Sequence, residues 1–481
     1  MTAPVLQRFA LNFWTLTVSK VLYRLVSIGV AMYLARTLGA AVLGDYAVVM
    51  NVLTLYLAFA DLGVTNLVIK DVSQNRDLTA SYLDNFFVLQ FLVGLLLVGL
   101  IMLTGFLSGY EQLLLIALAI GSVGPFFSGL SNAYQALMNA HELFFPFAII
   151  EVVCMLLFLF GNVAVVLAGE GLLALIAVTS LVSIAKYVLG AAWAKRFAMR
   201  VRLGFEWHTV RALLTAGLPF LLINGMHFAI QRMDVLFLKG LVDAERVGMY
   251  AAASRLIFAS LFLLSAVGAL LYPVFSRLLV EDSRRAAAAY ARGTVYVYLL
   301  SVIMAQLFIT FAPSIITILY GSAYAEAAYV LQLLSLFVPL FGLGLLASNV
   351  LMVSGAVWRA VWASIAAMLI GIAVSPFAIG AWEIRGAAIA VLLAEAIAAV
   401  LYIVFMYRSL GMSLPWMRLI GGSAAVALPL LLLRLAGLPM EPVSGIASFV
   451  CSVSLLFVLR VLSMKDVREI RGLLLTRESA K

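Results

Sequence analysis

Charged residues are scarce in this sequence, and the few that interrupt long apolar runs are its most informative feature. Only 11% of the 481 residues are Asp, Glu, Lys or Arg, whereas 65% are hydrophobic. Strand-length alternation is absent, and apolar runs reach 20 to 27 residues, which is the length of a membrane-spanning helix. The composition excludes a soluble domain and a barrel, and it predicts an all-α polytopic membrane protein.

The residues of catalytic and metal sites are also missing. No serine–histidine–acid set, metal-ligand spacing or glycine-rich phosphate loop is present. The two cysteines, Cys154 and Cys451, both lie in apolar runs, which favours packing over a disulfide or a metal site. We therefore expect no catalytic residues, no metal and no cofactor, apart from a coupling H⁺ or Na⁺. A membrane enzyme such as a polymerase or glycosyltransferase would be expected to carry a sizeable outer loop, and none is evident.

Hydropathy predicts fourteen spans, at residues 10–36, 43–66, 84–108, 112–137, 145–168, 172–193, 212–238, 247–274, 294–313, 326–353, 358–380, 385–406, 417–437 and 443–464. On the side of the two termini lie 20 Lys and Arg residues, against 5 on the other side. This bias predicts cytoplasmic termini in a bacterial or archaeal cytoplasmic membrane. The excess positive charge, +9 in total, is then expected to set the orientation of the chain in the membrane and to contact lipid headgroups. Nucleic acid is not an expected partner.

Several charges fall within the predicted spans, where an ionised group costs about 2.5 to 3.5 kcal/mol on insertion scales. Lys20 and Arg24 lie one turn apart on the first span, which has no acid to neutralise them. Tyr23 and Ser27 share that face by helical spacing. Arginine forks and lysine point charges both suit phosphate oxygens. The candidate substrate-binding residues are Lys20, Tyr23, Arg24, Lys186, Arg232 and Arg255.

Embedded acids offer a structural alternative, because each could neutralise one of these cations. They are also candidates for gating or for binding a coupling ion. Asp61 is expected to cap or lock the cytoplasmic gate near Lys70. The acids are Asp61, Glu151, Asp234 and Glu395.

A faint internal repeat divides the chain. Gly44-Asp45-Tyr46 recurs as Gly248-Met249-Tyr250, an offset of 204 residues. The repeated unit holds an even number of spans, so both copies enter the membrane in the same sense. The repeat predicts a six-helix bundle at 1–205, a second at 206–410, and an accessory helix pair with a tail at 411–481.

Residues 35–74 resemble the opening of the Wzx-type polysaccharide-export flippases, in a superfamily that also holds multidrug and peptidoglycan-precursor exporters. The matching motifs are Arg36 to Gly39, Gly44 to Tyr46 and Asp61 to Gly63, with further similarity at residues 217–238 and 247–256. The resemblance implies two bundles in a V around a central cavity that opens alternately to either side.

These observations favour a flippase that moves a polyprenyl-diphosphate-linked oligosaccharide to the outer leaflet for surface polysaccharide assembly. Its partners would be that glycan lipid, the bilayer and a polysaccharide polymerase. A flippase of peptidoglycan lipid precursors stays open as an alternative, since its headgroup is also an anionic diphosphate. A cation-coupled multidrug exporter fits less well, because a site for cationic drugs would favour acids and aromatics.

Overall fold

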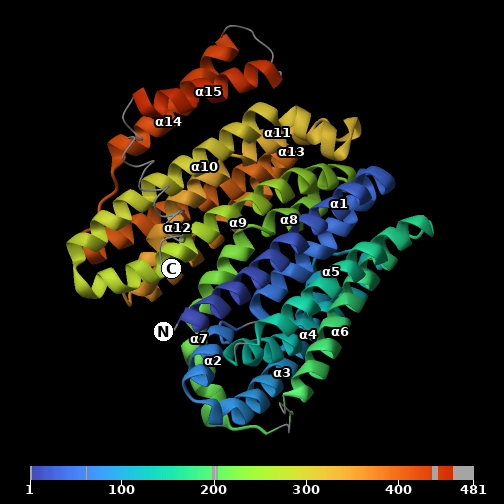
Figure 1. The fold of residues 1–481 in the computed structure, drawn as a ribbon. Helices are drawn as coiled ribbons and strands as arrows, with labels where there is room; N and C mark the ends of the chain where they lie inside the picture. Colours follow the sequence, from blue (N-terminus) through green and yellow to red (C-terminus); the bar gives the residue numbers. More distant parts are fainter. Residues whose placement is uncertain are drawn as a thin grey trace. The chain divides into compact units, whose positions relative to one another are not determined.

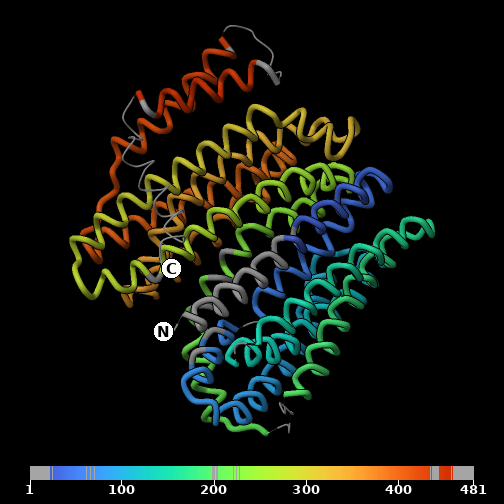
Figure 2. Tube along the Cα trace, viewed as in Figure 1, coloured from blue at the N-terminus to red at the C-terminus, as the bar shows by residue number. Residues whose placement is uncertain are grey.

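The structure is a computed structural model that describes residues 3–60, 62–141, 143–197, 201, 204–435 and 442–458. Figure 2 draws in grey the residues whose placement, or whose side-chain placement, is uncertain. Every regular element in these ranges is helical, which confirms the predicted all-α class. Lys20 and Arg24 belong to a described helix, but their side chains lie outside the described part of the chain. Asp61 lies outside the described residues altogether.

The structure contains fifteen α-helices in the described residues, labelled α1 to α15 in chain order (Figure 1). Those of the first half are α1 (Ala3–Ala60), α2 (Thr65–Gln74), α3 (Thr79–Leu107), α4 (Gln112–Ala140), α5 (Phe144–Leu167), α6 (Leu172–Arg196), α7 (Trp207–Ile230) and α8 (Met233–Leu241). Those of the second half are α9 (Ala244–Glu281), α10 (Ser283–Tyr320), α11 (Ala327–Leu334), α12 (Phe337–Val353), α13 (Val357–Leu410), α14 (Trp416–Leu435) and α15 (Pro442–Val458).

The described helices overlap every predicted span. Ten are long and apolar enough to cross a bilayer, and the bent pair α7–α8 makes an eleventh. α1 and α13 each cover two predicted spans, because each passes through a kink where the sequence predicts a loop. α15 overlaps the last predicted span, but its apolar part, Ser444–Leu456, is shorter than a full span within the described residues. The prediction of a polytopic membrane protein is confirmed.

The two kinks have different backbone chemistry. In α1 the kink lies at Gly39, whose φ of 82° and ψ of 175° suit only a residue without a Cβ. In α13 it lies at Glu383, with φ 53° and ψ −128°. A non-glycine residue in such a conformation costs about 1 to 3 kcal/mol and persists only where its surroundings hold it. The Glu383 kink is therefore a strained position that other contacts must stabilise.

Backbone contacts divide the chain into two compact units. The first comprises Met1–Ala252 with Met368–Ala387, and the second Ala253–Ala367 with Ala388–Lys481. α9 and α13 each contribute to both units. The three domains predicted at 1–205, 206–410 and 411–481 stay a prediction.

In the first unit, α4 is the central helix and packs against α3, α6 and α1 (Figure 1). α5 packs against α1 and α6. One end of this unit has an apolar core in which Val68 of α2, Phe86 of α3 and Leu137 of α4 are fully buried. This packing places facing side chains of α1, α5 and α6 within reach of one another.

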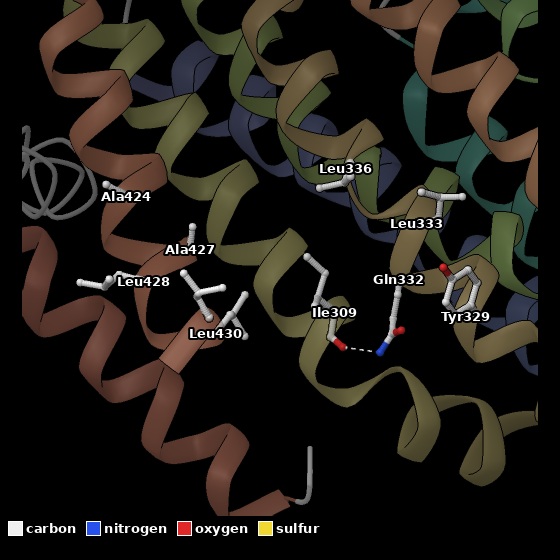
Figure 3. Close-up of a pocket in the computed structure, with 10 residues that line it drawn as sticks. Ile309, Tyr329, Gln332, Leu333, Leu336, Ala424, Ala427, Leu428 and Leu430 are labelled. Atoms are coloured by element: carbon white, nitrogen blue, oxygen red, sulfur yellow. Dashed lines mark hydrogen bonds between the residues drawn. The ribbon is translucent and has the colours of Figure 1, made fainter. Parts of the chain in front are cut away.

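In the second unit, α10 packs against α11, α12 and α14. Pro313 lies inside α10 and has no N–H to donate to the carbonyl of Ile309, four residues earlier. Gln332 of α11 replaces that donor, because its Nε2 donates to the Ile309 oxygen at 2.9 Å (Figure 3). The bond lies beside an apolar pocket of about 670 Å³ between α10, α11 and α14.

Candidate functional site

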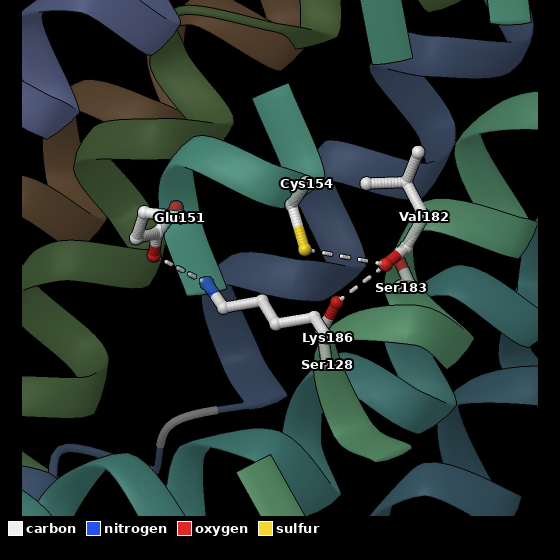
Figure 4. A network of polar contacts seen from close by, with 6 residues as sticks. All are labelled: Ser128, Glu151, Cys154, Val182, Ser183 and Lys186. Atoms are coloured by element: carbon white, nitrogen blue, oxygen red, sulfur yellow. Dashed lines mark hydrogen bonds and ion pairs between the residues drawn. The ribbon is translucent and has the colours of Figure 1, made fainter. Parts of the chain in front are cut away.

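An ion pair between α5 and α6 is the main polar feature inside the first unit (Figure 4). Lys186 Nζ donates to Glu151 Oε1 at 2.7 Å, and the two side chains are 24% and 11% exposed. The ammonium also lies 5.1 Å from the centre of the Phe147 ring, which is a cation–π distance. The lysine is thus neutralised, yet it keeps some access to solvent or to a ligand.

Further polar groups surround this pair. Cys154 Sγ lies 3.9 Å from the Val182 carbonyl oxygen, and Ser128 Oγ donates to Ser183 Oγ at 3.5 Å (Figure 4). Tyr23 of α1 stacks at a tilt on Phe158, with 6.0 Å between ring centres, and its hydroxyl lies within electrostatic range of Glu151.

The structure therefore brings together three predicted site residues, Tyr23, Glu151 and Lys186. These polar side chains face one another because a polar group within an apolar span is stabilised most by contact with a second polar group. We call Tyr23, Glu151 and Lys186 the α5–α6 cluster, after the two helices that carry the ion pair; Tyr23 joins it from α1.

A second group surrounds the break between α7 and α8. Arg232 Nη1 donates to Asn51 Oδ1 of α1 at 2.8 Å. Asp234 is fully buried in the first turn of α8, where a carboxylate favours the helix N-terminus. One Asp234 oxygen accepts the Val235 N–H at 2.8 Å, and the other accepts the hydroxyl of Tyr250. Arg232 and Asp234 thus bind different helices, as their two-residue spacing predicts.

Two ion pairs bind the kinked helices α1 and α13 to neighbouring helices within the first unit. Lys239 at the end of α8 donates to Asp45 of α1 at 2.7 Å. Arg246 in the first turns of α9 binds Glu383 at the α13 kink. The second pair explains how the strained Glu383 backbone is held in place. We call these two pairs the kink clamp.

Beside the kink clamp, α1 and α9 meet at a reciprocal contact. A Cβ placed on Gly44 would lie 2.9 Å from the carbonyl carbon of Ala244, and one on Gly248 would lie 2.9 Å from that of Ala40. Carbon atoms in ordinary contact are about 3.5 to 4.0 Å apart. Only glycine fits at both positions. These four residues form the glycine contact, and its two sides are related by the sequence repeat.

The second unit holds two predicted site residues in different settings. Arg255 of α9 is half-buried and lies near the hydroxyl of Tyr320. Glu395 of α13 is only 2% exposed, and its Oε2 has no hydrogen-bond partner among the described residues.

The structure gathers some predicted site residues and leaves others apart. Tyr23, Glu151 and Lys186 meet, whereas Arg232 and Asp234 belong to the α7–α8 break, and Arg255 and Glu395 belong to the other unit. Their roles in binding or coupling stay predictions.

Sequence reasoning missed the kink clamp. Asp45 adjoins Gly44 in the repeated motif, and this was the one signal that could have pointed there. Lys239 and Arg246 were counted only as surface charges that set topology. Within the described residues, no group of three or more His, Cys, Asp or Glu side chains could hold a metal ion.

Comparison with known proteins gives one family match. The profile of the polysaccharide biosynthesis protein family matches residues 33–329, which is more than half of the chain. No protein with curated annotation matches the sequence.

Several solved structures share the fold at low sequence identity. The lipid II flippase MurJ in an inward closed conformation aligns with a TM-score of 0.73 and 14% identity, covering 94% of this chain and 99% of MurJ. An inward-facing multidrug resistance MATE transporter aligns with a TM-score of 0.68 and 15% identity, over 81% of this chain and 94% of its own. A transporter of the same superfamily from Pyrococcus furiosus, whose binding pocket is described as having reverse polarity, aligns with a TM-score of 0.59 and 14% identity. The alignment covers 84% of this chain and 95% of that transporter.

Proposed function

Because the chain belongs to the polysaccharide biosynthesis protein family, we propose that it is a flippase for a polyprenyl-diphosphate-linked oligosaccharide. It would carry the glycan headgroup from the cytoplasmic to the outer leaflet, where a polymerase can use it. The shared fold with MATE and MurJ transporters supports a transport role over an enzymatic one. The excess of Lys and Arg on the terminal side supports cytoplasmic termini.

The α5–α6 cluster is the observation that carries this proposal. Lys186 is a partly exposed cation inside the helix bundle, held by a single carboxylate. A diphosphate oxygen can replace Glu151 as its partner, since an opposite charge at about 4 Å contributes on the order of 4 kcal/mol at intermediate dielectric. Tyr23 adds a hydroxyl donor beside the same position. The resting ion pair lowers the net attraction for phosphate, which keeps the ligand releasable.

Release to the outer leaflet requires a second element, and the glycine contact with the kink clamp supplies it. Both lie at connections that the charge bias assigns to the outer side. With the contact closed, the route to that side is blocked between α1 and α9. Opening would part α1 from α9 at the glycines. Movement of α1 away from α8 would also break the Asp45–Lys239 pair, where water can solvate the charges.

The test is flipping of a lipid-linked oligosaccharide by purified protein in proteoliposomes. We expect Lys186→Ala to reduce the initial rate by about 10- to 150-fold, because a hydrogen bond to a charged group contributes about 1.5 to 3 kcal/mol. Lys195→Ala is the matched control, since Lys195 lies on the same helix and is exposed. Equal rates for Lys186→Ala and the control would refute the binding role.

A double variant separates binding from folding. Lys186→Ala alone strands the Glu151 carboxylate and lowers stability, whereas Lys186→Ala with Glu151→Ala removes both charges. We expect the double variant to recover thermal stability without recovering transport. Recovery of both would show that the pair is only a structural salt bridge.

The substrate class is tested in cells. Depletion of the protein should remove surface polysaccharide without lysis. Lysis on depletion would favour a peptidoglycan precursor as the substrate instead.

A further inference from the structure

Of the four embedded acids predicted from the sequence, the structure describes Glu151, Asp234 and Glu395, and these differ in how their oxygens are used. Glu151 is bound to the ammonium of Lys186. Asp234 accepts hydrogen bonds at both oxygens. Glu395 has no basic partner among the described residues, and its Oε2 accepts no hydrogen bond from them. Only Glu395 is thus left to exchange a small ligand without breaking an existing contact.

The surroundings of Glu395 are apolar and mostly small. Val391, Ala394 and Ala398, which precede and follow it on α13, are fully buried. Ala399, one turn further on, faces Gly344 of α12, where an added Cβ would lie 3.3 Å from the Ala399 Cα.

Hydroxyl groups lie near the carboxyl but are already engaged. Tyr402 lies within electrostatic range of Glu395. Its hydroxyl lies 2.6 Å from Ser364 Oγ, on the other arm of α13, and these two groups satisfy each other. Within the described part of the chain, no charge on either arm or on α12 compensates a carboxylate here.

An ionised carboxylate in this setting is strongly disfavoured. Removal of a charge from water without a partner costs several kcal/mol, and such groups take the neutral form. A neutral carboxylic acid needs only a proton, whereas a bound metal cation needs several oxygen ligands. The valine and alanines that flank Glu395 supply no side-chain oxygen.

We propose that Glu395 is a proton-binding site that couples transport to a proton gradient. Building on the proposed flippase function, Glu395 holds a proton in the conformation described here and releases it when α12 and α13 separate enough to admit water. Where the two helices meet, Gly344 lies against Ala399 and the ring of Tyr402, and separation at this close approach would expose Glu395. Each cycle then binds and releases one proton, and Na⁺ does not replace it.

Infrared difference spectroscopy tests proton occupancy without any transport assay. The wild-type protein should show the C=O stretching band of a protonated carboxyl at neutral pH, with a shift in D₂O. Glu395→Gln should lack this band, and Glu151→Gln should retain it because Glu151 is paired with the Lys186 ammonium. A band that is absent from the wild type, or that survives in Glu395→Gln, overturns the assignment.

Proteoliposomes with an imposed pH difference test the coupling. If one proton moves per headgroup, a difference of one pH unit shifts the steady-state leaflet ratio of the glycan lipid by up to about tenfold. Either sign of shift supports coupling and tells whether proton and lipid move together or in opposite directions. Glu395→Gln should abolish the shift, Glu395→Asp should retain part of it, and a Na⁺ gradient should have no effect.

Ser364→Ala is the matched control, because it changes a neighbouring polar group without removing the acid. A wild-type ratio that ignores the pH difference, or a Glu395→Gln ratio that still follows it, refutes the coupling. If the wild type flips no lipid-linked glycan at all, the proposed function fails, whereas the infrared result still decides whether Glu395 binds a proton.

Discussion

The glycine contact gives the sharpest quantitative prediction, because a single methyl group should force it open. In Gly248→Ala the new Cβ would lie 2.9 Å from the Ala40 carbonyl carbon and nearer still to its oxygen. Ordinary carbon contacts of about 3.5 to 4.0 Å require α1 and α9 to separate by roughly 1 Å. Overpacking of this kind costs about 1 to 3 kcal/mol. If the contact is the outer gate, the closed state loses that amount relative to the open state.

A cost of about 1 to 3 kcal/mol corresponds to a 5- to 150-fold change in population. The change can be measured by labelling a cysteine at Ala47, which is 7% exposed and lies one turn beyond Gly44 on α1. The protein would carry Ala47→Cys with Cys154 and Cys451 replaced by serine, and an impermeant thiol reagent would be added outside. We expect Gly248→Ala to raise the labelling rate by a factor in this range.

Two further variants make the experiment decisive. Gly44→Ala should match Gly248→Ala because the contact is reciprocal, and the double variant should show less than the sum of the two effects. Gly29→Ala is the control on the same helix, since a Cβ there meets no atom within 4 Å. If the three single variants label at equal rates, the glycine contact does not close the outer route.

Two predictions concern stability. Gln332→Leu strands the Ile309 carbonyl beside Pro313 and should cost about 1 to 3 kcal/mol of unfolding free energy in detergent, while the same change combined with Pro313→Ala should cost less, because the helix then supplies its own donor. Burial lowers the pKa of the His141 imidazole, which lies 2.9 Å from the Thr79 hydroxyl. The unfolded chain then binds protons more readily than the folded one, so the stabilising effect is complete above the unfolded value of about 6.5 and declines as the pH falls below it. Thermal stability measured from pH 7.5 to 5 should fall more in the wild type than in His141→Gln, and parallel curves would contradict the assignment.

Hydropathy predicted the fold well because each span needs a long apolar run, and such runs are plain in the sequence. It could not predict that Gly39 and Glu383 are kinks within helices, because a sharp turn and a kinked junction have the same hydropathy. The continuation of α9 to Glu281 and the start of α10 at Ser283 were also missed, since the basic segment between these two predicted spans resembles a surface connection in composition.

The site was less predictable for a different reason. Helices such as α5 and α6 are apolar on nearly all faces, so periodicity does not show which side chains face a neighbour. Lys186 could therefore be identified as an embedded cation, and Glu151 as one of several possible partners, but their pairing depends on how the helices are rotated against one another. The unpartnered state of Glu395 likewise appears only once the neighbouring side chains are placed.

The proposed outer gate contains positions that are alike in the two copies of the repeat and positions that differ between them. Gly44 and Gly248 must be alike, because a reciprocal backbone contact closes only if neither side carries a Cβ. The next position need not be alike: Asp45 binds Lys239, whereas its counterpart Met249 is buried. Symmetric glycines thus set how closely α1 and α9 approach, and the asymmetric charge binds α1 to α8, the short helix directly before α9. A pair that is 17% and 25% exposed can exchange its partner for water at modest cost, which is what a gate that opens once per cycle requires.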